Sequence, residues 1–177
     1  MTLAAETDKL ANAKAQGQAQ FDSIREMVEA LQEARGEGDG QDRESYSDVQ
    51  DRDSYTVDES AVEEAERAIH GDPLSVEVRG PWVPADRYHP QSNDLDTPAE
   101  YRILLCAGGP AVQIVGELSE HGEPETARMQ VQDWFTPWTD FLPNDFQSVY
   151  AADESQTRRE RVEGVLLAYA RCFYFGE

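Results

Sequence analysis

Cysteine, lysine and long apolar runs are all scarce in this chain of 177 residues. Its two cysteines, Cys106 and Cys172, lie in apolar stretches, which favours buried reduced thiols over a disulfide scaffold. No run approaches the roughly 18–20 apolar residues of a membrane span, and the N-terminus lacks the apolar segment of a secretory signal. We therefore expect a cytoplasmic protein with no membrane partner.

Positive charge is equally scarce, because 15 Lys and Arg stand against 36 Asp and Glu, for a formal net charge of −21. The lysines are Lys9 and Lys14, and the one basic cluster is Arg158, Arg159 and Arg161. A field of this sign repels phosphate backbones and attracts basic proteins or cations. The composition therefore disfavours direct nucleic-acid binding and favours a basic partner.

Motifs for catalysis and for metal binding are also missing. The carboxylate-rich run that starts at Asp51 begins like an EF-hand loop, but it has Thr56 where Gly is required and Val62 where Glu is required. The three histidines are isolated from one another and from the cysteines, so no zinc spacing exists. The chain also has no Gly-x-Ser-x-Gly elbow. We predict no catalytic residue, no metal and no cofactor, with an enzyme of unknown class as the remote alternative.

What the sequence does contain, in its first half, is the pattern of two acidic helices. Apolar residues recur at helical spacing over residues 20–35, and a second helix is expected over residues 60–71, where Ser60 and Glu63 have capping-box spacing. The carboxylates of these helices that form the candidate acidic surface are Asp22, Glu26, Glu29, Glu33, Glu59, Glu63 and Glu66.

Between these helices lies a glycine-rich, acidic segment with a nine-residue repeat, in which Gln41-Asp-Arg-Glu-Ser-Tyr46 is echoed by Gln50-Asp-Arg-Asp-Ser-Tyr55. Its low hydrophobicity and high charge predict a flexible linker. We therefore divide the chain into an N-terminal amphipathic acidic helix (1–35), a flexible acidic linker (36–57) and an α+β domain (58–177).

The residue pattern in the second half of the sequence predicts a β-sheet. Alternating or apolar runs suggest four strands between residues 74 and 134, and Gly108-Gly109-Pro110 suits the turn of an antiparallel hairpin. Thr157 and Glu160 have capping-box spacing at the start of a closing helix. The expected fold is α+β: a mainly antiparallel four-stranded sheet covered by a C-terminal helix and preceded by two acidic helices.

Residues 134–146 form a loop rich in aromatic side chains among prolines. Exposed, these side chains would form a hydrophobic binding site for a protein partner; buried, they would line the core. Both interpretations stay open for Trp134, Phe135, Trp138 and Phe141.

The acidic helices suggest nucleic-acid mimicry, in which carboxylates occupy the phosphate track of a DNA- or RNA-binding protein. Asp22 to Glu33 spans roughly 16 Å at about 1.5 Å per residue, or about one charge per 5 Å. A DNA strand presents one charge per about 3.4 Å. One helix is therefore too sparse, and mimicry requires the second helix to pack beside it. The alternative is that the charge only keeps the protein soluble.

Residues 72–177 resemble an uncharacterised protein family of phages, plasmids and other mobile elements in proteobacteria. The resemblance rests on four strings: Asp72-Pro-Leu-Ser-Val-Glu-Val-Arg79, Ile103-Leu-Leu-Cys-Ala-Gly-Gly-Pro-Ala-Val-Gln-Ile114, Gln132-Asp-Trp-Phe-Thr-Pro-Trp138 and Phe173-Tyr-Phe-Gly-Glu177. It implies a setting inside a host cell, where small acidic proteins often look like anti-CRISPR or antirestriction inhibitors.

Together these patterns predict a non-catalytic inhibitor of a host nucleic-acid-binding defence complex. Its acidic surface would mimic nucleic acid and bind a basic nucleic-acid-binding protein of the host. The alternative is a mobile-element accessory protein that binds a protein partner through the aromatic loop.

Overall fold

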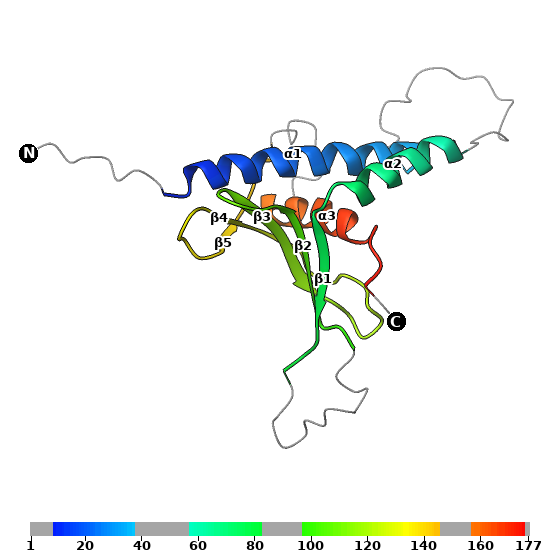
Figure 1. Cartoon of the computed structure of the whole chain (residues 1–177). Helices are drawn as coiled ribbons and strands as arrows, with labels where there is room; N and C mark the ends of the chain where they lie inside the picture. Colours follow the sequence, from blue (N-terminus) through cyan, green and yellow to red (C-terminus); the bar gives the residue numbers. More distant parts are fainter. Residues whose placement is uncertain (1–8, 38–56, 83–96, 146–156, 176–177) are drawn as a thin grey trace, which may run out of the picture.

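The chain forms an α+β fold, described here by a computed structural model for residues 9–37, 57–82, 97–145 and 157–175 (Figure 1). The elements run in the order α1 (Ala11–Ala34), α2 (Glu59–Gly71), β1 (Ser75–Arg79), β2 (Glu100–Cys106), β3 (Ala111–Glu117), β4 (Arg128–Gln132), β5 (Thr139–Phe141) and α3 (Arg158–Ala170). Most of the predicted linker, with its repeat, lies outside the described residues.

The five strands form one antiparallel sheet in the order β1-β2-β3-β4-β5, so each strand pairs with its neighbour in sequence. The prediction of four strands was therefore wrong by one. The strand it lacked, β5, is only three residues long and lies inside the segment expected to be an aromatic loop. The hairpin predicted at Gly108-Gly109-Pro110 is confirmed, since it joins the antiparallel strands β2 and β3.

Alternate residues divide the sheet into a buried face and an open face. In the buried row, Ile103 of β2 lies opposite Ile114 of β3, which lies opposite Met129 of β4, and all three side chains are buried. The next row, on the other face, carries Arg102 and Arg128. This alternation with period two is the expected signature of a sheet with one covered side.

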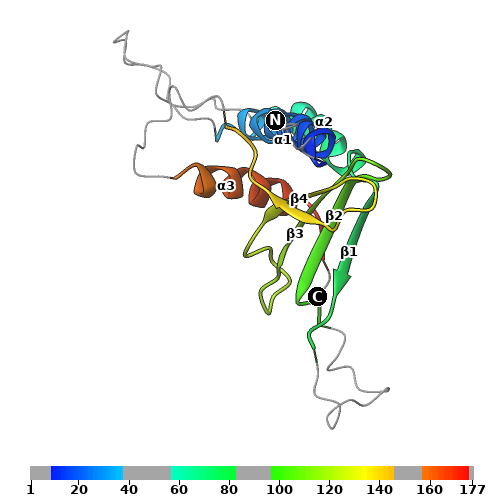
Figure 2. The same ribbon diagram turned by 90° about the vertical axis from the view of Figure 1, so that its left-hand side faces the viewer.

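Helices α1 and α3 both pack against the sheet, rather than the C-terminal helix alone, which corrects the predicted arrangement (Figure 2). Helix α1 packs against β3, β4 and α3, and α2 packs beside α1. Phe21 and Ile24 of α1, Ile69 of α2, and Leu166 and Tyr169 of α3 join the sheet residues in one hydrophobic core. The long N-terminal helix is therefore part of the same core as the sheet.

Caps fix where the two shorter helices begin. The predicted capping box of α3 is confirmed. The Thr157 hydroxyl accepts a hydrogen bond from the Glu160 amide, and the Glu160 carboxylate accepts one from the Thr157 amide. In α2 the cap is Asp58 rather than Ser60, since the Asp58 carboxylate accepts from the amides of Ser60 and Ala61. Asp and Ser are about equally good N-caps, so the spacing alone did not distinguish them.

No helix in the described part of the chain is both long and apolar enough to cross a membrane.

Candidate protein-binding surfaces

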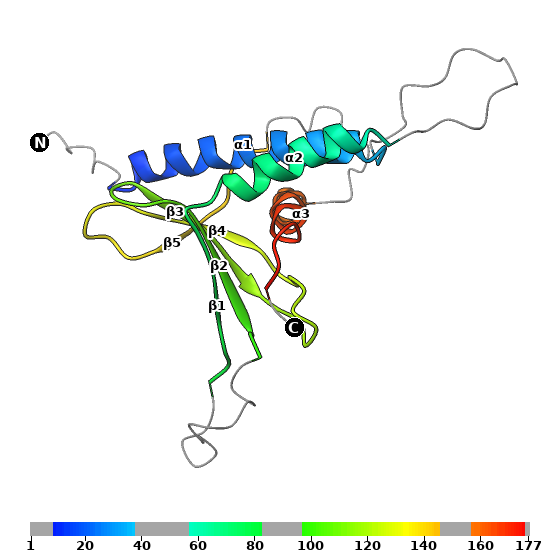
Figure 3. The same cartoon turned by 45° about the vertical axis from the view of Figure 1, so that its right-hand side comes forward.

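The seven carboxylates predicted as an acidic surface lie on two adjacent helices. On α1, Asp22, Glu26, Glu29 and Glu33 lie on the side of the helix opposite its buried apolar stripe. Helix α2 lies beside the C-terminal part of α1 and adds Glu59, Glu63 and Glu66 (Figure 3). Five of the seven are exposed, and Asp22 and Glu66 are half-buried. We call these seven residues the acidic face.

Two arginines neutralise part of the acidic face. Arg25 Nη2 lies 3.4 Å from Asp22 Oδ1, and Arg25 Nε lies 3.7 Å from Glu29 Oε1. Arg35 Nη2 donates to Glu66 Oε1 at 2.8 Å, which ties the end of α1 to α2. Seven carboxylates and two guanidinium groups leave a net charge of −5.

The remaining four carboxylates of the acidic face, Glu26, Glu33, Glu59 and Glu63, hold no ion pair within the described ranges. They are therefore the members of the face that are available to an outside cation. Arg25 was not predicted to be part of this surface, although its spacing of three residues from Asp22 and four from Glu29 is the usual signal for helical ion pairs.

The aromatic loop divides into exposed and packed residues. Phe141 lies in β5 and packs against the core, and Trp138 is half-buried. Trp134 is 66% exposed and the Phe135 side chain is fully exposed, with their ring centroids 6.4 Å apart. We call Trp134 and Phe135 the aromatic tip. The loop thus combines both predicted roles: its tip is exposed, as a binding site would be, and Phe141 lines the core.

The turn that carries the aromatic tip is held by a hydrogen-bond network. Thr136 N donates to the Asp133 carbonyl, Asp133 N donates to Thr136 Oγ1, and Trp134 N donates to Asp133 Oδ1, at 2.8 to 3.0 Å. Within this turn Phe135 has φ of +61°, the left-handed region that costs a non-glycine residue about 1–2 kcal/mol. A fixed turn thus exposes an apolar ring at a cost in backbone energy.

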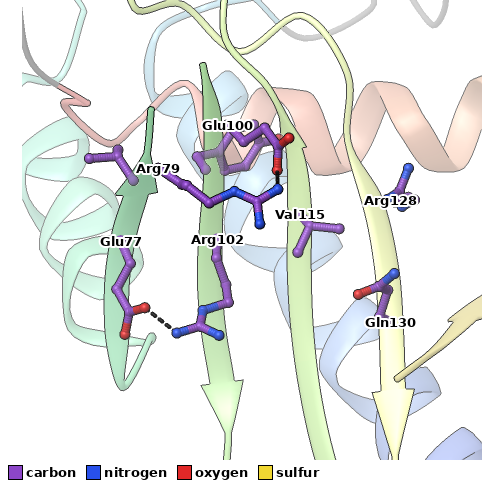
Figure 4. Close-up of a pocket in the computed structure, with 9 residues that line it drawn as sticks. Glu77, Arg79, Glu100, Arg102, Val115, Arg128 and Gln130 are labelled. Carbon is purple, nitrogen blue, oxygen red and sulfur yellow. Dashed lines mark hydrogen bonds and ion pairs between the residues drawn. The ribbon is translucent and has the colours of Figure 1, made fainter. Parts of the chain in front are cut away.

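Arginines also gather on the open face of the sheet, a cluster that was not predicted from the sequence. Arg79, Arg102 and Arg128 line a shallow pocket of about 460 Å³ together with Glu77 and Glu100 (Figure 4). Arg102 pairs with Glu77 and Arg79 pairs with Glu100 across β1 and β2. The Arg102 guanidinium, and then Ser75, lower the pKa of the Glu77 carboxyl by hydrogen bonding.

This pocket holds no excess of positive charge, because Arg128 in turn lies 3.4 Å from Asp140. The alternation of Ser75, Glu77 and Arg79 in β1 is the sequence signal that could have located it. As cross-strand ion pairs exposed to solvent, these residues stabilise the sheet only weakly.

Burial, full or partial, shields both cysteines and the phenol of Tyr169. Burial raises the pKa of both Cys106 and Cys172, which disfavours a reactive thiolate. Burial, and then the hydrogen bond to Asp72, raise the pKa of Tyr169 above its usual range. Within the ranges that the structure covers, no three His, Cys, Asp or Glu side chains converge as a metal site would require.

Comparison with family models, with curated proteins and with solved structures found no match for this chain.

Proposed function

We propose that this protein is a non-catalytic inhibitor that covers the nucleic-acid-binding surface of a basic partner with its acidic face. The observation that carries the proposal is the packing of α2 beside α1 (Figure 3), which brings a second helix with exposed carboxylates next to the first. One helix alone presents charge too sparsely to resemble a phosphate track. Two adjacent helices supply the second row of carboxylates that mimicry of a phosphate track requires.

The energies and the range of exposed ion pairs are consistent with binding that depends on many weak charge contacts. Exposed ion pairs contribute about 0.2–1 kcal/mol each, so a partner must engage several carboxylates at once. Their attraction extends about 8 Å at physiological ionic strength and shortens as salt is added. A mimic of this kind binds strongly at low salt and competes directly with nucleic acid.

The biological setting of the proposal comes from the resemblance of residues 72–177 to proteins of phages, plasmids and other mobile elements. In that setting, in the cytoplasm of the host, the partner would be a component of a nucleic-acid-binding defence complex. Inhibition of the anti-CRISPR or antirestriction type would follow from exclusion of DNA or RNA from its binding surface.

The test is capture of host proteins on the immobilised full-length chain at about 0.05 M and about 0.5 M salt, followed by elution with double-stranded DNA. The proposal predicts basic nucleic-acid-binding proteins that are captured at low salt, released at high salt and displaced by DNA. If excess DNA leaves the captured protein in place, the acidic face does not occupy the nucleic-acid site and the proposal fails.

The aromatic tip supports a second candidate, a mobile-element accessory protein that binds its partner through Trp134 and Phe135. The specific observation is the fully exposed Phe135 ring, held at an unfavourable φ by the turn around it. Exposed aromatic side chains on a fixed turn make strong contacts that salt does not weaken. Capture that persists at about 0.5 M salt and is lost in the Phe135→Ser variant would support this candidate. Capture unaffected by Phe135→Ser would contradict it.

A further inference from the structure

Strand β1 is an edge of the sheet with one neighbour. It pairs with β2, and no other described strand pairs with its second side. An edge of this kind presents a row of backbone N–H and C=O groups that are suited to pairing with another strand. The question is which strand fits it.

The side chains of β1 on the helix side are less well covered than those of its neighbour. Val76 and Val78 lie opposite Ile103 and Tyr101, which are buried, yet Val78 is itself 49% exposed. Leu74, just before the strand, is also exposed, and Trp82, just after it, is 92% exposed. The edge therefore carries an apolar strip, which is unusual for an edge that stays single in solution.

We propose that β1 pairs with β1 of a second copy of this chain, antiparallel and with Val78 on the two-fold axis. In this register Val78 lies opposite Val78, Val76 opposite Gly80, and Leu74 opposite Trp82 of the second copy. This pairing extends each strand past the ends of β1, from Leu74 to Trp82, so that all of these residues fall on one side of the joined strands and the apolar strip of each copy covers that of the other. The two sheets then form one continuous antiparallel sheet with the helices of both copies on the same face.

Charge on the open face selects this register. With Val78 on the axis, Glu77 of each copy lies opposite Arg79 of the other. Each row across the joined strands then runs from Arg102 and Glu77 of one copy to Arg79 and Glu100 of the other. Its charges alternate in sign, so it extends the two ion pairs already present within each chain. Registers centred on Glu77 or on Arg79 place two like charges directly opposite each other, which destabilises a pair of strands.

Two close registers remain: the one centred on Val76 leaves Glu77 opposite Ser75 of the second copy and Trp82 without an opposite residue, and the one centred on Gly80 leaves Arg79 opposite Pro81. The pairing of opposite charges and the burial of Trp82 both favour the register centred on Val78. Because β1 contributes nothing to the acidic face, dimerisation can fail while the proposed function holds, and the reverse is also true.

A disulfide across the axis tests both the dimer and its register. The full-length Val78→Cys variant should form a disulfide-linked dimer under mild oxidation, because identical residues on the axis lie within the roughly 4.4–6.8 Å between Cα atoms that a disulfide needs. The Val76→Cys variant is the matched control, since its partner position is Gly80. The wild-type chain controls for Cys106 and Cys172. Crosslinking of Val76→Cys to the same extent, or none in Val78→Cys, overturns the proposal.

Light scattering provides an independent measurement. The wild-type chain should have twice the 19.8 kDa chain mass, and the Val78→Lys variant should have the single mass while keeping its circular dichroism spectrum. Val57→Lys is a control with matched exposure, 52% against 49%, and lies away from the edge strand. It should stay dimeric. A wild-type chain that stays monomeric up to about 100 μM overturns the proposal.

Discussion

Individual arginines set how much charge the acidic face presents. Arg25 lies against Asp22 and Glu29, and Arg35 is paired with Glu66, so the free charge concentrates on the four remaining carboxylates. A count of acidic residues in the sequence overstates the charge that a partner would meet. The side chains that a partner can use are those without an internal cation.

Phe135 is the other residue with a distinct role, and its backbone gives a prediction for stability. Phe135→Gly should leave the free energy of unfolding unchanged or raise it by up to about 1 kcal/mol. Glycine adopts φ of +61° without strain, and the fully exposed ring makes little packing contribution. Urea denaturation measures the change.

The control for this prediction is Trp134→Gly. Trp134 is not among the residues with positive φ, and its indole packs against Gly109, so glycine there should lower the free energy of unfolding by about 1 kcal/mol or more. A loss of stability in Phe135→Gly as large as in Trp134→Gly would contradict the account of the turn.

At the scale of elements, the sequence predicted the type of each long element better than its limits. The large apolar residues from Phe21 onward marked the second half of α1, but the helix begins at Ala11. Its first half is buried through Ala13 and Gly17, which carry no large apolar side chain to reveal the pattern. Strand β5 was missed because three residues cannot establish an alternation.

The sites were less predictable than the fold. Sequence spacing placed the carboxylates on one side of α1, but whether α2 packs beside it depends on tertiary contacts such as the burial of Ile69 and the pairing of Arg35 with Glu66. For the aromatic loop, composition could not separate Phe141, which packs on the core, from Phe135, which is exposed.

The close packing of α1 on the sheet predicts opposite effects for two glycines. Gly17→Ala should lower the free energy of unfolding by about 1–3 kcal/mol, because its Cβ would lie 2.7 Å from Val131 Cγ1 and 3.0 Å from Phe141 Cδ1. Gly164→Ala in α3 meets no atom within 4 Å and should raise stability by about 0.5–1 kcal/mol. Thermal and urea denaturation of both variants measure the difference. Equal effects at the two sites would show that α1 does not approach the sheet this closely.

For the whole molecule, a net charge of −21 should destabilise the compact state through self-repulsion. Raising sodium chloride from about 0.01 M to about 0.5 M shortens the screening length several-fold, so the melting temperature should rise by about 2–4 °C for each 1 kcal/mol of repulsion removed. Potassium chloride should act equally. A melting temperature that falls with either salt would mean that internal ion pairs outweigh the repulsion.

The central claim is that the position of the carboxylates, and not the total charge, makes this protein bind. It is tested most directly by two variants that each change the net charge by four, from −21 to −17. One carries Glu26→Gln, Glu33→Gln, Glu59→Gln and Glu63→Gln in the acidic face. The other carries Glu117→Gln, Glu120→Gln, Glu123→Gln and Glu125→Gln, which are equally exposed around the β3–β4 connection.

The measurement is the dissociation constant of each variant for the partner captured at low salt. Loss of four exposed contacts worth about 0.2–1 kcal/mol each removes about 0.8–4 kcal/mol in total, which predicts at least about fourfold weaker binding for the acidic-face variant. The variant changed around the β3–β4 connection should bind within about twofold of the wild type. Equal weakening of the two variants, or none in the acidic-face variant, would contradict the claim.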